Sequence, residues 1–290
     1  MYPRFLGIGA QKAGTTWLYE NLRRHPQLWL PPVKELHYLD QKPPRLTKRL
    51  FGKTAPMRTA RQHLREQLLL FARGRGRWQD LAWAAHYCLL PRSDAWYRGL
   101  FPEIEGRVPG EICPGYARLD AQAVGEVRRR MPDARILYLL RDPIERSWST
   151  SAMHFRKPNF GHIEEFSNAE IEAHFTRAKT ARHDDYLGNL ASWSRHYPAA
   201  QIFVGFFDDL VEDPRAFLVS VLTFLGVDAS ERAIPPDVGS RRNAGQGEEI
   251  PERFAKFLAR HHYARICALD ERFSNRHTKR WRQRAEQLIA

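Results

Sequence analysis

The sequence predicts an α/β fold, in which a central parallel sheet carries helices on both of its faces. Short apolar segments at residues 4–9, 135–140 and 202–207 are typical of strands, and the second has the unbroken apolar pattern of a strand buried on both faces. Helix signals follow each segment. Strands that alternate with helices favour parallel pairing, with ligands bound at the carboxyl ends of the strands.

The first strand leads into a Gly-rich turn and then into a helix over residues 15–25, which Pro26 ends. Pro31 and Pro32 then favour an extended segment over residues 33–40. Because side chains alternate along an extended chain, Glu35 and His37 are expected to point the same way. On composition alone we would interpret this stretch as a polar edge segment.

The character of the chain changes between residues 43 and 102, where basic stretches containing Leu and Trp are interrupted by Gly and Pro. Residues 60–73 and 78–89 have the composition of helices, so we predict a helical insertion at about 44–100 that serves as a lid or an acceptor-binding face. Its tryptophans could suit a saccharide, although aromatic residues of this kind more often belong to a core. These tryptophans are Trp78, Trp83 and Trp96.

After the insertion, residues 110–116 are expected to form a turn and residues 121–130 a helix. Asp142-Pro143 and Asp213-Pro214 each begin a helix, with Pro in the first turn, and Gly226 ends the second of these helices. The remaining predicted elements are a polar loop at 240–247 and helices at 251–273 and 276–290. We expect residues 1–290 to form a single domain.

Composition limits the class of protein. The chain has 290 residues, of which 43% are hydrophobic, so it can bury a large core. No apolar stretch is long enough for a transmembrane helix and no signal peptide is recognisable, so we expect no integral membrane segment. Three widely spaced cysteines argue against a disulfide framework or a zinc site and favour a reducing, cytoplasmic compartment.

The net charge of +13 invites a nucleic-acid interpretation. The basic residues are dispersed, however, and no known nucleic-acid-binding motif is recognisable, so we expect no nucleic acid as a partner. An enzyme that handles anionic molecules fits better. A non-catalytic basic module that binds nucleic acid or a sulfated glycan is the alternative from another class of protein.

The turn after the first strand has the features of a phosphate-binding loop. Backbone N–H groups of such a turn and of the helix that follows point at an anion, and Lys12 would reach the oxygens where charge develops. Gly9 and Gly14 have the spacing found in nucleotide triphosphatases, but Thr15 stands where their Lys belongs. This displacement favours a phosphate-bearing donor other than ATP. A P-loop-type kinase acting on a small molecule is the alternative.

A second anion-binding element follows the strand at 135–140. Arg141 comes directly after that strand, at the same edge of the sheet as the first loop. If residues 143–155 are helical, Ser149 lies about two turns further on, where its hydroxyl and Arg141 could hold one phosphate together. On its own the pattern would equally fit a helix-capping Asp142 beside a surface Arg.

Together these two motifs resemble the sulfotransferase family that uses 3′-phosphoadenosine 5′-phosphosulfate (PAPS). The resemblance implies a P-loop-like three-layer fold, with the first loop on the 5′-phosphosulfate and the Arg141–Ser149 pair on the 3′-phosphate. It also implies a nucleotide contact from Arg241 or Arg242, in a loop that departs from the pattern of better-known branches. The residues of the first loop expected to bind the donor are Gln11, Lys12, Ala13, Gly14, Thr15, Thr16 and Trp17.

The same resemblance gives the polar segment at 33–40 a function. In the glycan-directed branch of the family, a Glu-x-His segment after the first helix carries the catalytic base. Carried over to this chain, Glu35 is the expected general base, His37 a supporting polar group, and Asp40 a weaker candidate for contacting the acceptor.

The reaction so implied is in-line transfer of a sulfuryl group to a hydroxyl or amine, with 3′,5′-adenosine bisphosphate as the product. No metal is predicted, because a sulfuryl donor needs no Mg²⁺ bridge and the chain lacks the Lys-Ser/Thr pair of a nucleotide triphosphatase. The expected acceptor is a small molecule or a glycan, anionic ones included. We expect a bacterial setting, because animal members of the family usually carry a Golgi membrane anchor.

Overall fold

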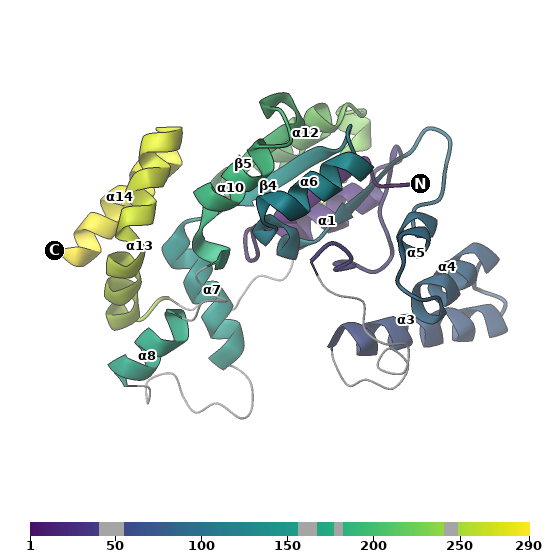
Figure 1. Cartoon of the computed structure of the whole chain (residues 1–290), viewed down its shortest axis with the longest axis horizontal. Helices are drawn as coiled ribbons and strands as arrows, with labels where there is room; N and C mark the ends of the chain where they lie inside the picture. Colours follow the sequence, from purple (N-terminus) through teal and green to yellow (C-terminus); the bar gives the residue numbers. More distant parts are fainter. Residues whose placement is uncertain (41–54, 156–166, 177–181, 241–248) are drawn as a thin grey trace.

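Five parallel strands form one sheet in the computed structural model, which describes residues 1–40, 55–155, 167–176, 182–240 and 249–290. Their order across the sheet is β2-β3-β1-β4-β5 (Figure 1). The strands are β1 (Phe5–Gly9), β2 (Leu28–Trp29), β3 (Val108–Ile112), β4 (Arg135–Leu140) and β5 (Ile202–Phe206). The α/β fold class expected from the sequence is confirmed.

Strand β1 occupies the centre of the sheet and sets its register. Leu6 pairs with Glu111 of β3 on one side and with Ile136 of β4 on the other. All residues of β1 are buried, as expected for a strand covered on both faces. Because the strands run in one direction, the loops that follow them meet at one edge of the sheet.

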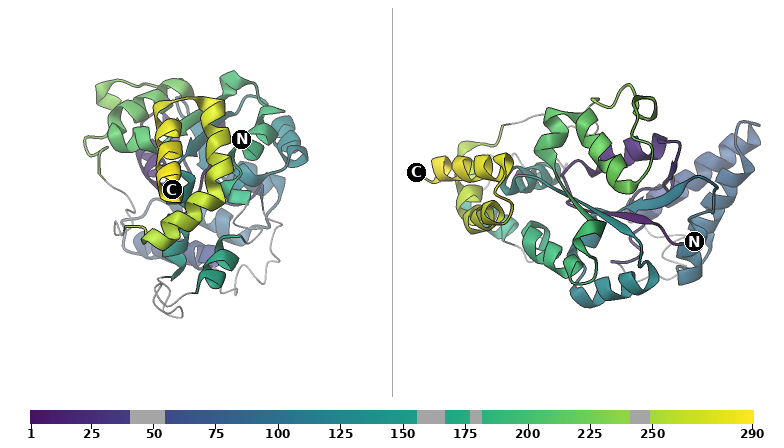
Figure 2. Two further views of the ribbon diagram at one scale, coloured as in Figure 1. Left: turned by 90° about the vertical axis from the view of Figure 1, so that its left-hand side faces the viewer. Right: turned by 90° about the horizontal axis from the view of Figure 1, so that it is seen from above.

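Helices cover both faces of this sheet. Helices α1 (Thr15–Arg24) and α12 (Pro214–Leu225) lie on one face, and α6 (Ala121–Arg130) and α10 (Tyr186–Ser194) lie on the other (Figure 2). Trp17 of α1 packs against Phe217 of α12 with 6.1 Å between ring centroids. The result is the three-layer arrangement predicted from the alternation of strands and helices.

Further helices extend the molecule at the two ends of the sheet. Helices α3 to α5 lie at one end, and α13 and α14 lie at the opposite end (Figures 1 and 2). Among the described residues, the helices not yet given bounds are α3 (Ala55–Ala72), α4 (Trp78–Leu89), α5 (Asp94–Gly99), α7 (Pro143–Phe155), α8 (Asn168–Phe175), α11 (Phe207–Glu212), α13 (Glu252–Phe273), α14 (Arg276–Ile289) and the short 3-10 helices η1 (Pro114–Arg118), η3 (Ala199–Gln201) and η4 (Glu231–Ala233). Within the described parts of the chain, none of these helices has the length and apolar character that crossing a bilayer requires.

Capping residues in the sequence predicted the ends of several helices correctly. The Asp120 side chain caps α6 by accepting a hydrogen bond from the Ala123 N–H at 2.8 Å. Asp213 caps α12 in the same way, and Gly226 ends that helix with φ 67°, a left-handed conformation that favours glycine. The helices predicted at 60–73 and 78–89 correspond to α3 and α4. That the whole chain is one domain stays a prediction.

The turn predicted at 110–116 is wrong in its first part, where the chain forms β3 and only then turns into η1. Pairing in the sheet overrides the weak strand preference of the Pro109-Gly110 pair. Gly110 pairs in register with Phe5 of β1, and a Cβ atom built on Gly110 would lie 2.0 Å from the Phe5 ring. The glycine therefore marks a close approach between strands rather than a turn.

Candidate active site

The loop after β1 forms the start of the site. Lys12 and Gly14 both adopt left-handed backbone conformations, with φ of 70° and 82°, and α1 begins directly afterwards at Thr15. A Cβ atom on Gly14 would lie 2.9 Å from the Leu210 side chain, so a larger residue does not fit there. The N–H groups of the first turn of α1 have no partner within the helix and can bind an anion.

Not every residue of this predicted loop presents a side chain to a ligand. Trp17 is buried, and its indole N–H donates to the Val238 carbonyl at 2.8 Å, so only its backbone N–H can serve an anion. Ala13 and Thr15 are also buried, whereas Gln11 and Thr16 are half-buried.

Lys34 joins this loop to the catalytic segment that was expected from the sequence. Its ammonium group donates to the hydroxyls of Thr15 and Thr16 at 3.3 and 3.2 Å, and to the Glu35 carboxylate at 3.0 Å. The Lys34 side chain is 18% exposed, so these contacts are largely shielded from water. Lys34 was not among the residues expected to act in the site, and only its position directly before Glu35 could have pointed to it.

The segment around Glu35 is not extended, contrary to the expectation from Pro31 and Pro32. Glu35 and His37 have φ of 62° and 54°, because the loop folds back over the end of β3 instead of continuing as a strand. The two side chains nevertheless meet, with 3.6 Å between Glu35 Oε2 and His37 Nε2. The pairing was therefore expected for the wrong geometric reason.

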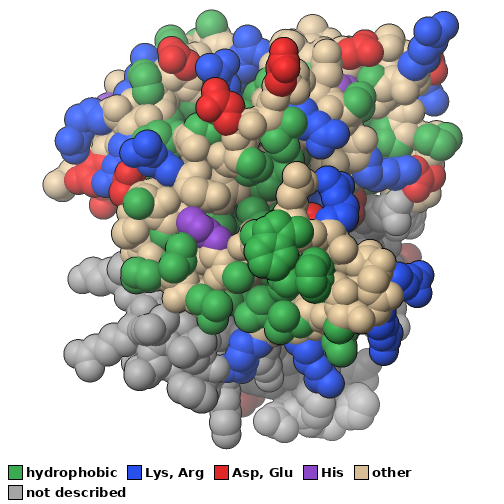
Figure 3. Space-filling model, turned by 90° about the vertical axis from the view of Figure 1, so that its right-hand side faces the viewer, with side chains coloured by type: hydrophobic (Ala, Val, Ile, Leu, Met, Phe, Trp, Pro, Cys, Tyr) green, Lys and Arg blue, Asp and Glu red, His purple; other side chains and the backbone are tan. Residues whose placement is uncertain are grey.

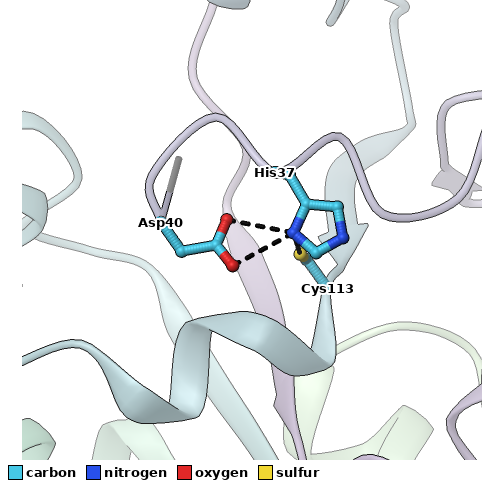
Figure 4. A group of neighbouring side chains, drawn as sticks. All are labelled: His37, Asp40 and Cys113. Atoms are coloured by element: carbon cyan, nitrogen blue, oxygen red, sulfur yellow. Dashed lines mark hydrogen bonds and ion pairs between the residues drawn. The ribbon is translucent and has the colours of Figure 1, made fainter. Parts of the chain in front are cut away.

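His37 is held from its other side by two more residues (Figure 4). Its Nδ1 lies 3.0 Å from both carboxylate oxygens of Asp40 and 3.5 Å from the Cys113 sulfur. Gly115 makes room for this group, since a Cβ atom there would lie 2.2 Å from Asp40 Oδ2. The imidazole is thus fixed in orientation between the carboxylates of Glu35 and Asp40.

These contacts set the charges of the site. Partial burial acts to raise the pKa of Glu35, but the neighbouring His37 and Lys34 outweigh it and lower that pKa to about 2. Burial acts to lower the pKa of His37, but its contacts with Asp40, Cys113 and Glu35 raise that pKa to about 12. At neutral pH the site therefore holds a Glu35 carboxylate between two cations.

A buried carboxyl group on β3, that of Glu111, fixes the loop in place. It accepts hydrogen bonds from the Tyr97 hydroxyl at 2.6 Å, the Tyr116 hydroxyl at 2.9 Å and the Leu36 N–H at 3.1 Å. Tyr116 in turn accepts from the Tyr38 N–H at 3.0 Å. Burial raises the pKa of Glu111 to about 7, more than these hydrogen bonds lower it. Sequence reasoning missed this role, because nothing local distinguishes Glu111 from a surface carboxylate.

The end of β4 reaches the first loop through Arg141. Its guanidinium donates to the Lys12 carbonyl at 3.1 Å and to Glu145 at 3.3 Å, and it lies 4.7 Å from the Phe207 ring centroid. Arg284 of α14 also binds Glu145, at 2.7 Å, and so brings a second guanidinium to the same place. This contribution of Arg284 was not predicted, because Arg284 and Arg141 lie far apart in the sequence.

The remaining predicted contacts to the nucleotide are less defined. Ser149 is half-buried in α7, and its joint contact with Arg141 to a phosphate stays a prediction. Arg241 and Arg242 lie outside the described residues.

Among the residues that the structure describes, two groups of side chains have the donor atoms that a metal ion would need. His37, Asp40 and Cys113 form one group, and Asp209, Glu212 and His277 form the other, with ligand atoms within 4.8 Å of one another in each. In the second group, Arg276 already binds Asp209 and Glu212, at 3.0 and 2.6 Å. The prediction of no metal is not tested by this arrangement.

Fold and site together define an α/β protein of the P-loop-like type, in which a Gly-containing loop at a helix N-terminus lies beside a carboxylate–imidazole pair. A sequence model of the Sulfotransferase family matches residues 3–231, which is most of the chain. The chain belongs to the sulfotransferase family, as the two motifs had indicated.

Curated sulfotransferases are similar to part of the chain. Mouse heparan sulfate glucosamine 3-O-sulfotransferase 3A1 is 29% identical over 138 residues, covering 46% of this chain and 35% of the relative. Human heparan sulfate glucosamine 3-O-sulfotransferase 3B1 is 28% identical over 138 residues, with the same coverage. The chain thus matches about a third of the length of these curated relatives.

Solved structures share the fold. A sulfotransferase from Alicyclobacillus acidocaldarius superposes with a TM-score of 0.64 at 19% identity, covering 97% of this chain and 99% of that one. The sulfotransferase domain of the Synechococcus PCC 7002 olefin synthase gives a TM-score of 0.53 at 18% identity, covering 90% and 94% of the two chains.

Replacing Glu111 by Gln should flatten the pH dependence of stability. With its pKa raised from 4.5 to about 7, the folded protein keeps a proton that the unfolded chain releases, so stability falls as pH rises through that window. The wild type should therefore lose roughly 3 kcal/mol of stability relative to E111Q between these two pH values. Urea unfolding at a series of pH values measures this difference. Glu105→Gln, in an exposed loop, is the control, and parallel curves for wild type and E111Q would contradict the assignment.

Proposed function

We propose that this protein transfers the sulfuryl group of PAPS to a hydroxyl or amine of a carbohydrate acceptor, with Glu35 as general base. The observation that carries the proposal is the bridge made by Lys34, which links the loop hydroxyls of Thr15 and Thr16 to Glu35. A donor seated on the loop would thereby have its reacting group beside the base. Family membership favours sulfuryl transfer over the kinase alternative.

The chemistry of the loop fits the donor. A helix N-terminus, two hydroxyls and the ammonium groups of Lys12 and Lys34 offer hydrogen-bond donors and positive charge, which match phosphate and sulfate oxygens. PAPS supplies the sulfuryl group, activated by its bond to a phosphate oxygen. Arg141 and Ser149 are proposed to hold the 3′-phosphate, with Arg241 or Arg242 as a further contact.

In the proposed reaction, an acceptor oxygen or nitrogen forms a bond to sulfur while Glu35 takes its proton. The bond from sulfur to the phosphate oxygen breaks, and that oxygen keeps the electron pair. Lys12 and the N–H groups at the start of α1 stabilise the charge that develops there. His37 and Asp40 keep Glu35 in position. No step of this proposal requires a metal ion.

A carboxylate with a pKa of about 2 is a weak base, so the pairing with Lys34 needs to loosen for the reaction. Donor oxygens on the loop would compete with Glu35 for the Lys34 ammonium group. As Lys34 turns to the donor, Glu35 loses one of its two neighbouring cations and its pKa rises. We therefore propose that Lys34 couples donor binding to the strength of the base.

The acceptor is proposed to be a glycan, because the relatives named above are glycan sulfotransferases. A hollow of about 210 Å³ opens beside the catalytic loop, lined by Tyr38 and Leu39 of that loop and by Arg92, Arg130 and Glu126. Its two guanidinium groups outnumber its single carboxylate, which favours an acceptor that carries negative charge. The cytoplasm is the proposed location, since Cys88, Cys113 and Cys267 form no disulfide.

Glu35→Gln should keep donor binding and lose transfer, because the substitution removes only the proton acceptor. Turnover should fall roughly 10²- to 10⁴-fold, while the affinity for 3′,5′-adenosine bisphosphate stays within about twofold. Transfer from radiolabelled PAPS and calorimetry with the bisphosphate measure the two quantities, and Glu105→Gln is the matched control. Turnover near that of the wild type would exclude Glu35 as the base.

Lys34→Met should shift the acidic limb of the pH profile of kcat/KM upward by roughly 1 unit, because loss of the cation raises the pKa of Glu35. Activity needs the carboxylate, so the variant should lose turnover at low pH first. Lys34→Arg, which keeps the charge, should restore the position of the limb. An unmoved limb in Lys34→Met would show that Lys34 does not act on Glu35.

Arg141→Ala should weaken binding of 3′,5′-adenosine bisphosphate roughly 10- to 100-fold, the range of a hydrogen-bonded charge pair. Adenosine 5′-monophosphate lacks the 3′-phosphate. Any loss of its affinity in the variant therefore measures only the loss of the hydrogen bond from Arg141 to the Lys12 carbonyl, which supports the loop. Calorimetry with both nucleotides separates the two effects, and Arg129→Ala, on the exposed side of α6, is the control. Equal losses for both nucleotides would remove Arg141 from the 3′-phosphate site.

A further inference from the structure

Exposed hydrophobic side chains concentrate at the tip of the hairpin formed by α3 and α4. This apolar tip consists of Leu68, Leu69, Leu70 and Phe71 at the end of α3 and Trp78 at the start of α4. These are five of the nine large hydrophobic side chains that are exposed among the described residues. Figure 3 shows hydrophobic side chains gathered on this face of the molecule. Such a concentration is unusual for a surface that faces only water.

Packing within the hairpin cannot account for these side chains. Residues 68–71 are consecutive, and at 100° per residue they cover most of the circumference of α3, so only part of them can face α4. Their exposed fractions lie between 38% and 51%, and that of Trp78 is 68%. The Phe71 and Trp78 rings contact each other edge to face, with 5.7 Å between centroids. The tip is therefore a small, preformed aromatic and aliphatic knob.

Positive charge surrounds this knob. The connection between the two helices contains Arg73, Arg75 and Arg77, all of them exposed. One side of α3 adds a hollow of about 520 Å³ that is lined by Arg61, Arg65 and Leu69. The sequence from residue 61 to residue 80 contains these five arginines and two acidic residues, Glu66 and Asp80.

The shape distinguishes between partners of the tip. Figures 1 and 2 show the hairpin extending away from the sheet, so its end is convex. A peptide or a protein partner usually inserts its own anchors into a groove, whereas a convex knob suits insertion into a soft surface. Aromatic and aliphatic side chains ringed by arginine are the combination that binds the boundary between lipid headgroups and acyl chains.

We propose that the apolar tip docks this protein on the surface of an anionic phospholipid bilayer. Phe71, Trp78 and the neighbouring leucines enter the boundary between headgroups and acyl chains. Arg73, Arg75 and Arg77 bind the headgroup phosphates around them. This contact does not rest on the proposed sulfuryl transfer, since no residue of the tip belongs to the donor loop or the catalytic segment.

Cosedimentation of the full chain with vesicles tests the proposal. The protein should sediment with vesicles of mixed phosphatidylcholine and phosphatidylserine and much less with phosphatidylcholine alone. Binding should weaken with rising salt, because the headgroup contacts are electrostatic. Equal binding to both kinds of vesicle, or none to either, would overturn the proposal.

Variants locate the contact. Phe71→Glu combined with Trp78→Glu should reduce binding at least about tenfold, since two charges would enter an apolar layer, whereas Val211→Glu, at an exposed apolar position elsewhere, should not. Arg75→Gln should weaken binding about fivefold and Arg129→Gln should not. If the double variant proves unfolded by circular dichroism, Trp78→Glu alone replaces it, because that side chain is the most exposed.

Two results would show that the tip is not the lipid contact. A dimer in light scattering that Phe71→Glu with Trp78→Glu converts to monomer would make the tip an interface between copies of the chain. Vesicle binding that survives the double variant unchanged would move the lipid contact elsewhere. Either result overturns the proposal, and nucleotide binding by calorimetry checks that each variant keeps its donor site.

Discussion

The buried carboxyl group of Glu111 is the constraint on which the loop around Glu35 and His37 depends. It stands in the middle of the sheet, in register with Leu6 of the central strand, and receives three hydrogen bonds in a region that water does not reach. One of these bonds comes from the backbone of Leu36, which lies between Glu35 and His37. The end of β3 adds a second contact, because the Ile112 carbonyl accepts a hydrogen bond from the Glu35 N–H at 3.3 Å, so the sheet sets the position of the loop at two points.

The loop can adopt its shape only because this anchor and its neighbours outweigh the local preferences of the chain. Two non-glycine residues, Glu35 and His37, have positive φ, which costs about 1 kcal/mol or more for each. Their side chains then face one another, and Lys34 donates hydrogen bonds to the hydroxyls of Thr15 and Thr16 in the loop after β1. The backbone strain and the two cationic neighbours of Glu35 belong to the same arrangement, which holds the Glu35 carboxylate between Lys34 and His37.

The sequence was sufficient for those parts of the fold that local chemistry determines. The buried strand at 135–140, the capped helix that begins at Pro143 and the Gly-rich turn before α1 carry their signals within a few residues. Strand β3 was missed because Gly110 matters only through the Phe5 ring of a neighbouring strand. Glu35 and His37 were identified through a family resemblance, whereas Lys34, Glu111 and Arg284 act through contacts with distant segments. Such contacts leave no local pattern to recognise.

The distribution of charge explains why a net charge of +13 does not imply nucleic-acid binding. On α14, Arg276, Arg280 and Arg284 pair with carboxylates of α11 and α7, so much of the basic C-terminal cluster is neutralised within the fold. The arginines between α3 and α4, which are Arg73, Arg75 and Arg77, are exposed and lie next to the apolar side chains of the tip in the sequence. A polyanion such as nucleic acid would favour a continuous basic stripe, whereas a basic ring around an aromatic knob matches an anionic surface with an apolar interior.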